Sequence, residues 1–195
     1  MIDYIKGKII ELTPTYTVVE NSGIGYMIQI SLQTFSALEN RSDVTIYIHH
    51  YLREDDEQFY GFSSKDEREL FRLIISVSGI GVSTAQMMLS SMSSDEIRNA
   101  IISEDINRIK SIKGIGLKTA QRLILELKDK IVKGGGTGGS VIFSAGANAV
   151  VEEATTALVL LGFTKANVNK AISAVLKENP SANLETIIKM SLKRL

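Results

Sequence analysis

Apolar residues follow two different periods along this chain. Between residues 2 and 62 they fall in short β-branched and aromatic runs, separated by segments rich in Gly, Asn, Ser and Pro. From about residue 64 onward they recur every three or four positions, which is the period of a helix with one buried face. The pattern therefore predicts a β domain followed by helical segments.

The N-terminal runs predict five short strands. A small closed barrel is the usual way for five short strands to bury their apolar faces, and the OB-fold is the leading candidate. We place this domain at residues 1–63. The predicted strands are Ile2–Leu12, Tyr16–Glu20, Gly25–Ser31, Val44–Tyr51 and Gln58–Phe62.

The helical part divides at a glycine-rich segment. Residues 64–133 predict a compact helical domain whose first helix begins at Ser64, and Ser64-x-x-Glu67 and Ser93-x-x-Glu96 are both capping-box patterns. Residues 134–149 predict a flexible linker, because so many glycines do not hold regular structure. Residues 150–195 predict a three-helix bundle, so the fold class is α+β with several domains.

One phrase occurs twice in the helical domain. Ser78–Gln86 contains Gly-Ile-Gly, and Lys113–Gln121 repeats it 35 positions later in the same phase. Each copy lies between two apolar-periodic segments, which predicts paired helix-hairpin-helix motifs. The amides that begin the second helix of each motif lack intrahelical partners and can bind a DNA phosphate without reading a base. The candidate backbone-binding residues are Gly79, Ile80, Gly81, Gly114, Ile115 and Gly116.

The second copy adds side chains suited to phosphate. Lys118 and Arg122 are four residues apart and share a helical face, beside Thr119, whereas the first copy has Ser83 and Met87 at the equivalent positions. We expect the opposite face to be buried through Leu117, Ala120, Ile124, Leu127 and Ile131. A simpler interpretation is that the glycines only let two helices pack closely. A nucleotide loop is excluded because Leu117 stands where a Walker A loop needs glycine.

Composition narrows the functional classes. The 195 residues carry 22 basic and 22 acidic side chains and no cysteine, which suits a cytoplasmic protein without disulfides. His49 and His50 diverge in a strand and no third histidine exists, so we expect no metal site and no cofactor. No apolar run is long enough for a membrane span. Charge is uneven, since residues 106–133 hold eight basic and two acidic side chains, or +6.

An acidic stretch separates the last two predicted strands. Arg53 is followed by Glu54, Asp55, Asp56 and Glu57. Such a cluster is usually a solvated hairpin turn. The functional alternative is a negative projection that repels a nucleic-acid backbone and guides strands around itself.

The C-terminal bundle has no cluster of catalytic side chains. In its first helix we expect Val151, Ala154, Leu158 and Leu161 to share the buried face. A small bundle beyond a linker is typical of a docking module. Leu160, Leu161 and Phe163 are candidates for its contact surface, and some of them can equally be core.

These parts, in this order, resemble the RuvA family along essentially the whole chain. The matching segments include both Gly-Ile-Gly turns, Gly23–Tyr26, Arg53–Asp55, Tyr60–Phe62, Glu69–Phe71, Lys118–Lys128 and Leu158–Phe163. The family is the Holliday-junction-binding subunit of the bacterial branch-migration machine. The resemblance implies an OB-fold, a tandem helix-hairpin-helix domain and a mobile C-terminal domain that docks the hexameric RuvB ATPase.

The resemblance also implies how the chain is used. Family members form homotetramers, sometimes paired into octamers, that hold a four-way DNA junction open, with the RuvC resolvase in the same complex. Glu54 and Asp55 would then be acidic pins at the junction centre, and the chain itself would not be an enzyme. Ser83 departs from the basic residue that family members often carry there. The alternatives are a general helix-hairpin-helix repair scaffold without junction specificity and a metal-dependent nuclease or lyase using the acidic stretch.

Overall fold

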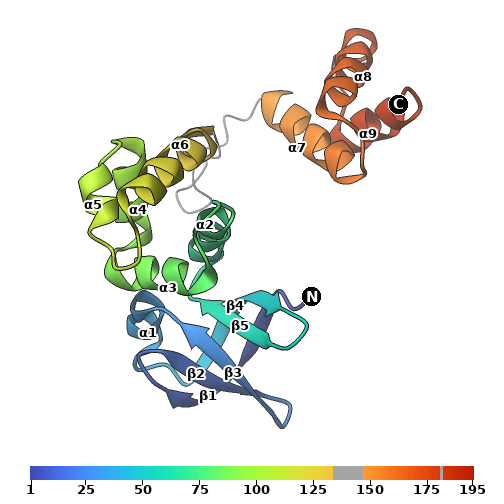
Figure 1. Cartoon of the computed structure of the whole chain (residues 1–195). Coiled ribbons are helices and arrows are strands. Elements are labelled where there is room, and N and C mark those ends of the chain that lie inside the picture. Colours follow the sequence, from blue (N-terminus) through green and yellow to red (C-terminus); the bar gives the residue numbers. More distant parts are fainter. Residues whose placement is uncertain (134–146, 181) are drawn as a thin grey trace. The chain divides into compact units, whose positions relative to one another are not determined.

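The chain consists of two compact units, Met1–Gly138 and Gly139–Leu195, and each is described by itself. A computed structural model describes residues 1–133, 147–180 and 182–195 (Figure 1). The predicted linker over 134–149 lies outside the described residues, except that its last three positions already belong to a helix.

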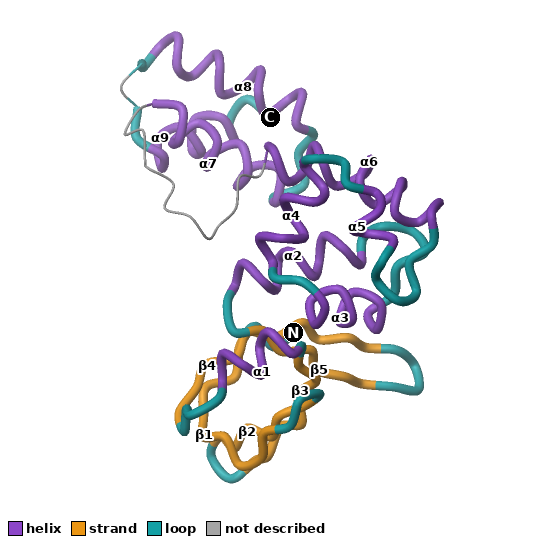
Figure 2. The backbone as a smooth tube through the Cα atoms, turned by 90° about the vertical axis from the view of Figure 1, so that its left-hand side faces the viewer, coloured by secondary structure: helices purple, strands orange, loops and turns teal. Residues whose placement is uncertain are grey.

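The N-terminal strands form a closed barrel in the order β1-β2-β3-β5-β4, which confirms the predicted OB-fold barrel (Figure 2). Only β3 and β5 pair in parallel; the other neighbours are antiparallel. Isoleucines and valines at alternate positions fill the interior, as period-two patterning requires. The strands are β1 (Tyr4–Leu12), β2 (Tyr16–Asn21), β3 (Ile24–Ile30), β4 (Asp43–Leu52) and β5 (Glu57–Phe62).

Closing the barrel requires glycine at position 61. A Cβ there would lie 2.4 Å from Cγ2 of Ile28 and 2.6 Å from Cγ2 of Ile46, both of which belong to the barrel core. Any side chain would push β3 and β4 away from β5, so Gly61 lets these strands approach.

Helix α1 (Leu32–Leu38), which connects β3 to β4, was not predicted from the sequence. Ser31 caps it by accepting a hydrogen bond from the Thr34 amide at 3.0 Å, and Leu38 points into the barrel core. The helix lies next to the helical domain, where the Leu32 amide donates to Ser90 Oγ (Figure 2).

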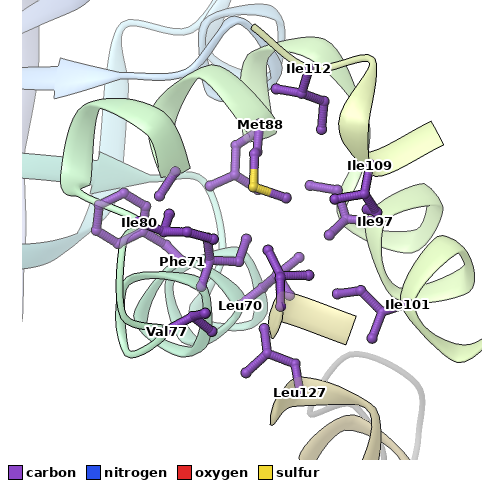
Figure 3. Packing of buried hydrophobic residues seen from close by; sticks show 14 of the residues in the cluster. Leu70, Phe71, Val77, Ile80, Met88, Ile97, Ile101, Ile109, Ile112 and Leu127 are labelled. Atoms are coloured by element: carbon purple, nitrogen blue, oxygen red, sulfur yellow. The ribbon is translucent and has the colours of Figure 1, made fainter. Parts of the chain in front are cut away.

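Five helices form the predicted helix-hairpin-helix domain around one apolar core (Figure 3). Leu70, Phe71 and Ile74 of the first helix are fully buried in it, and Ile75 packs against it in part. The helices are α2 (Lys65–Ile75), α3 (Val82–Ser91), α4 (Ser94–Ile102), α5 (Ile106–Lys110) and α6 (Leu117–Lys133).

The predicted buried face of α6 needs one correction. Ala120, Ile124, Leu127 and Ile131 are buried as expected, but Leu117 is 52% exposed. Leu117 is the first residue of the helix, where no preceding turn covers it, and Leu123 completes the buried face instead.

One of the two predicted capping boxes is incomplete. At α4, Ser93 and Glu96 exchange both hydrogen bonds. At α2, Ser64 Oγ accepts from the Glu67 amide at 3.1 Å, but the Glu67 carboxylate is directed to other partners. That carboxylate is nearly fully buried against the barrel.

The second unit is the predicted three-helix bundle, built from α7 (Ala147–Leu160), α8 (Lys165–Glu178) and α9 (Leu184–Leu192). Val168, Ala171, Ile172 and Val175 form the buried face of α8. None of the described helices has the length and apolar composition needed to cross a membrane.

The predicted buried face of α7 was wrong at its end. Leu161 is 61% exposed, because the helix stops at Leu160 and Gly162 turns the chain with φ of 100°. The left-handed residue is a helix C-cap, so the 3.6-residue period does not extend to Leu161. In α9, Leu192 is likewise more exposed than the period predicts.

Candidate nucleic-acid interface

The two Gly-Ile-Gly segments have the same backbone geometry. Gly79 and Gly114 have φ of 91° and 92°, a conformation that side chains rarely adopt. In each turn the isoleucine amide donates back across the turn, from Ile80 to Val77 at 3.1 Å and from Ile115 to Ile112 at 3.1 Å. The repeat in sequence is therefore a repeat in structure.

The isoleucine of each turn anchors it in the core of the helical domain. Ile80 and Ile115 are both 5% exposed and belong to the same apolar core; Ile80 is labelled in Figure 3. The glycines on either side are exposed, and a Cβ built on Gly81 or Gly116 would meet nothing within 4 Å. The turns thus present bare backbone to solvent.

Each of the helices that follow begins after a glycine, which has no side chain to cap the first amides. The first helical bond of α3 runs from Ala85 N to Gly81 O at 3.0 Å, and no side chain caps that end. The first bond of α6 runs from Ala120 N to Gly116 O at 2.9 Å. The amides before these bonds are available to an anion, and the helix dipole favours negative charge there.

The two turns adjoin each other. Arg122 of α6 donates from Nη1 to the carbonyl of Ser78, in the first turn, at 3.2 Å. A Cβ on Gly114 would lie 3.9 Å from the Thr84 side chain of α3. Both phosphate-sized sites therefore belong to one continuous surface of the first unit.

Unpaired cations lie on this surface. Lys118 and Arg122 are exposed, Thr119 is half-buried, and Lys118 has no ion-pair partner in the part of the chain that the structure describes. By contrast, Arg108 pairs with Glu96 at 2.6 Å and Lys128 pairs with Glu104, so these two basic side chains of the domain are neutralised. Lys118 and Arg122 therefore add positive charge beside the second turn.

The Glu96 side chain shows how an exposed carboxylate is held elsewhere in this domain. The Ser93 amide and hydroxyl donate to it, and with Arg108 they lower the pKa of Glu96 below its usual value. This carboxylate is committed to its own helix cap.

The acidic stretch is a tight hairpin loop between β4 and β5. The Arg53 amide donates to the Asp56 carbonyl at 2.8 Å, and residues 53–56 are all exposed. Figures 1 and 2 both show this loop projecting from the barrel. Glu54 and Asp55 are at its tip.

Side chains at the base of this loop brace it. The Tyr60 hydroxyl donates to Gln58 Oε1 at 2.6 Å, and Gln58 Nε2 donates to Asp56 Oδ2 at 2.8 Å. Burial raises the pKa of Tyr60, which keeps the phenol protonated as a donor. Arg53 Nε donates to the Tyr51 hydroxyl.

The loop does not form a metal centre with its neighbours. Among the described residues, no group of three or more His, Asp or Glu side chains is arranged to hold a metal ion. His50 Nε2 lies 2.8 Å from Glu57 Oε1, whereas His49 packs on Phe71, on the other side of the strand.

The second unit presents a small exposed apolar patch. Leu160 is 82% exposed and Leu161 is 61% exposed, at the turn after α7. Phe163, the third predicted docking residue, packs in part against the bundle core instead. The patch is therefore narrower than the sequence alone indicated.

Comparison with known proteins covers the chain from end to end. The RuvA N terminal domain model matches residues 1–61, the SAM-like helix-hairpin-helix tandem model matches 71–129, and the RuvA C-terminal domain model matches 149–195. A protein of Christiangramia forsetii is 50% identical over 195 residues, covering all of both chains. This chain belongs to the RuvA family.

Further relatives agree with this assignment. A Bacteroides fragilis protein is 50% identical over 202 residues, and a Bacteroides thetaiotaomicron protein is 46% identical over 201, with complete coverage of both chains in each comparison. Each of these relatives is named Holliday junction branch migration complex subunit RuvA. Family membership confirms the resemblance seen in the sequence.

Two features of the site were not predicted. The Arg122 contact with the Ser78 carbonyl joins the two turns, and no local pattern indicates a bond between residues 44 positions apart. The bracing of the acidic loop through Gln58 and Tyr60 was also missed, although both side chains follow the loop at alternate positions of one strand.

Proposed function

We propose that this chain binds four-way DNA junctions and acts as the DNA-binding subunit of a branch-migration complex. The observation that carries the proposal is one compact unit that combines two Gly-Ile-Gly turns of bare backbone with a projecting acidic loop. Relatives that this chain matches over their full length are named as junction branch-migration subunits, which supports the same function.

The turns would bind the sugar-phosphate backbone of the duplex arms. Gly79–Gly81 and Gly114–Gly116 offer uncapped amides, and Lys118 and Arg122 add charge beside the second turn. Thr119 supplies a hydroxyl at the same helix start. Recognition of this kind depends on DNA shape, because amides and cations that contact phosphates carry no base information.

Ser83 reduces the charge at the first turn. The equivalent of Lys118 is a neutral hydroxyl there, so the first motif supplies no cation of its own beside the amides of α3. Arg122 donates to Ser78 and so extends from the second site toward the first. We propose that it serves both phosphate sites.

The acidic loop would occupy the junction centre. Glu54 and Asp55 are exposed at the tip and lack the ion pairs that neutralise other carboxylates, within the described part of the chain. Negative charge there repels phosphates and disfavours strands that cross directly. The separated strands would pass on either side of the loop into neighbouring arms.

Four copies would be needed to engage four arms. We propose a homotetramer, with an octamer formed when two tetramers enclose the junction. Each phosphate site is weak alone, but simultaneous engagement of several arms raises the effective concentration of the rest. Assembly therefore converts sequence-independent contacts into preference for a junction.

The chain itself would be non-catalytic and need no cofactor. ATP hydrolysis would belong to the hexameric RuvB motor, and RuvC would cut junctions in the same cytoplasmic complex. Leu160 and Leu161 form the apolar patch to which the motor would dock, with Phe163 supporting it from the bundle core.

A binding titration tests this function. A synthetic four-way junction and a linear duplex of the same sequence are titrated with the protein, in magnesium and in chelator. We expect strong preference for the junction and no cleavage in either buffer. Equal affinity would leave a general helix-hairpin-helix scaffold, and magnesium-dependent cleavage would make the acidic loop a nuclease site.

A charge-neutral variant tests the acidic loop separately. Glu54→Gln with Asp55→Asn keeps the size of both side chains and removes the repulsion. We expect equal or tighter junction binding, together with altered migration when the RuvB motor is added. Unchanged migration would remove these residues from the junction centre.

A further inference from the structure

Two Ser-x-x-Glu patterns begin helices in the same domain, yet their glutamates differ completely. The Glu96 carboxylate is exposed and accepts the Ser93 amide at 2.9 Å, as a capping box requires. Glu67 is 1% exposed, and its carboxylate does not return to its own cap. Because the Glu67 carboxylate is buried and does not complete a capping box, its role must come from the other groups that it contacts.

The Glu67 carboxylate is bound by residues of the barrel. Ser31 Oγ donates to it at 2.9 Å, and Thr34 Oγ1 lies 2.9 Å from each carboxylate oxygen. Both hydroxyls are at the start of α1 and are completely buried. The Ser63 amide and hydroxyl complete the set at 3.1 and 3.0 Å.

The next residue binds a different part of the barrel. Arg68 donates from Nη1 to the Asp3 carbonyl at 2.7 Å and to Asp3 Oδ1 at 2.6 Å, with the Ile48 carbonyl at 3.4 Å. Its guanidinium also lies 5.7 Å from the centre of the Tyr47 ring. Arg68 is 5% exposed, so this charge too is buried and partnered.

Helix α2 is therefore fixed at two points. Glu67 holds the end of the barrel near α1, while Arg68 holds β4 and the segment before β1. Buried charges keep such partners because leaving either one unpaired is costly. Two separate attachments prevent α2 from rotating about a single contact.

This attachment lies between the two parts of the proposed DNA surface. Strand β5 begins directly after the acidic loop, and only Ser63 and Ser64 separate its end from α2. Helix α2 then leads to the first phosphate turn at Gly79. The acidic loop and that turn are thus at opposite ends of one strand-helix arm, clamped to the barrel at its middle.

We propose that Glu67 and Arg68 are positioning residues for junction specificity. They hold the acidic loop at a fixed place relative to the hairpin turns, so that both fit one junction. Binding to plain duplex uses the turns alone and does not need this alignment. The inference rests on the proposed junction function and adds residues that do not contact DNA.

The variant that tests it is Glu67→Gln, with Asp66→Asn as the matched control. Asp66 is the preceding residue of α2, and it pairs at 2.6 Å with Arg98, which belongs to the same helical domain. Both variants exchange a mostly buried carboxylate for an amide, but only Glu67→Gln affects the contact with the barrel. Thr34→Val removes the hydroxyl that contacts the Glu67 carboxylate, and so disrupts the same contact from the barrel side.

Affinities for junction and duplex are measured by fluorescence anisotropy, well below each variant's unfolding temperature. We expect Glu67→Gln to leave duplex affinity within about twofold and to weaken junction binding about tenfold, because avidity is lost when geometry prevents simultaneous contacts. Thr34→Val should also lower the ratio of junction affinity to duplex affinity. Combining Thr34→Val with Glu67→Gln should lower this ratio little further than Glu67→Gln alone. Asp66→Asn should keep the wild-type ratio.

A distance measurement provides a readout that needs no DNA. The chain has no cysteine, so spin labels can be attached through Arg41→Cys on the barrel and Lys110→Cys on the helical domain, both of which are exposed. Labelled protein is diluted with unlabelled protein so that distances within one chain dominate. We expect the distance distribution to broaden in Glu67→Gln and to stay narrow in Asp66→Asn.

The outcomes separate the two proposals. A wild-type protein that binds junction and duplex equally would refute the function itself. A wild-type protein that prefers the junction, with Glu67→Gln retaining that preference or Asp66→Asn losing as much, would overturn only the positioning role. A proportional loss of both affinities in Glu67→Gln and Thr34→Val would show a purely structural role.

Discussion

A methyl group added at Gly114 tests whether the second turn needs its left-handed backbone to fold. A methyl group added at Gly116 tests whether the turn contacts a phosphate. Gly114 has φ of 92°, and a Cβ there would meet only the Thr84 side chain, at 3.9 Å. The cost of Gly114→Ala is therefore backbone strain without a clash, about 1–2 kcal/mol. Gly116 is outside the left-handed region and its Cβ would meet nothing within 4 Å.

We expect Gly114→Ala to lower mainly the stability of the first unit, and Gly116→Ala to lower mainly its affinity for a junction. Gly114→Ala should lower the thermal midpoint of the first unit by about 3–6 °C, from roughly 3 °C per kcal/mol for a domain of this size. Gly116→Ala should change that midpoint much less. It places a methyl group where the phosphate approaches the first amides of α6, so we expect junction affinity to fall about tenfold, or about 1.4 kcal/mol.

Calorimetry and a junction titration on the same preparations give both quantities. Gly81→Ala repeats the test at the first turn, where the added Cβ also meets nothing. Wild-type affinity in Gly116→Ala and Gly81→Ala would refute the argument that these bare turns contact phosphates. A large loss of stability in Gly116→Ala would show instead that the second glycine is required for folding.

Three further predictions concern charge, docking and pH. Lys118→Ala with Arg122→Ala should flatten the dependence of log affinity on log salt by about 1.8 units for every protomer on the DNA, at about 0.9 per phosphate; an unchanged slope in salt titrations would remove both from the backbone contacts. Leu160→Asp with Leu161→Asp should keep junction binding but abolish stimulation by the motor, and retained stimulation would place the docking surface elsewhere. Burial, and then nearby cations, lower the pKa of His49, so the unfolded state binds more protons just below pH 6.5, and thermal stability should fall as pH drops through that range. His49→Gln should remove most of this dependence in thermal unfolding measured across that pH range.

Much of the fold could be predicted because its signals are local. Alternating apolar residues identified all five strands, and period-two patterning in Val44, Ile46 and Ile48 gave the buried face. Closure of the barrel depends on the parallel pairing of β3 with β5, which no local pattern encodes. Helix α1 was missed because seven residues give barely two turns of periodicity.

The candidate site shows the same division between local and distant information. The glycine turns could be predicted from the repeat, and the structure gives both the same left-handed backbone. The destination of the Glu67 carboxylate could not, because its partners Ser31 and Thr34 are more than thirty positions away. Leu161 was assigned to a buried face because the period was extended one residue beyond the end of α7 at Leu160, where the Gly162 turn begins.

The position of β1 has a consequence for how the protein is made. This strand is synthesised first, and it can pair early with β2, but its other edge must wait for β4, where Tyr4 meets Tyr47. The hydrogen bond between Asp3 and Arg68 forms later still, because Arg68 is synthesised after β4. The nascent chain therefore exposes one unpaired edge of β1 until β4 has emerged, whereas the local helical contacts that follow form quickly. Slowing translation before β4 has emerged should prolong the interval in which the nascent chain is open to mispairing.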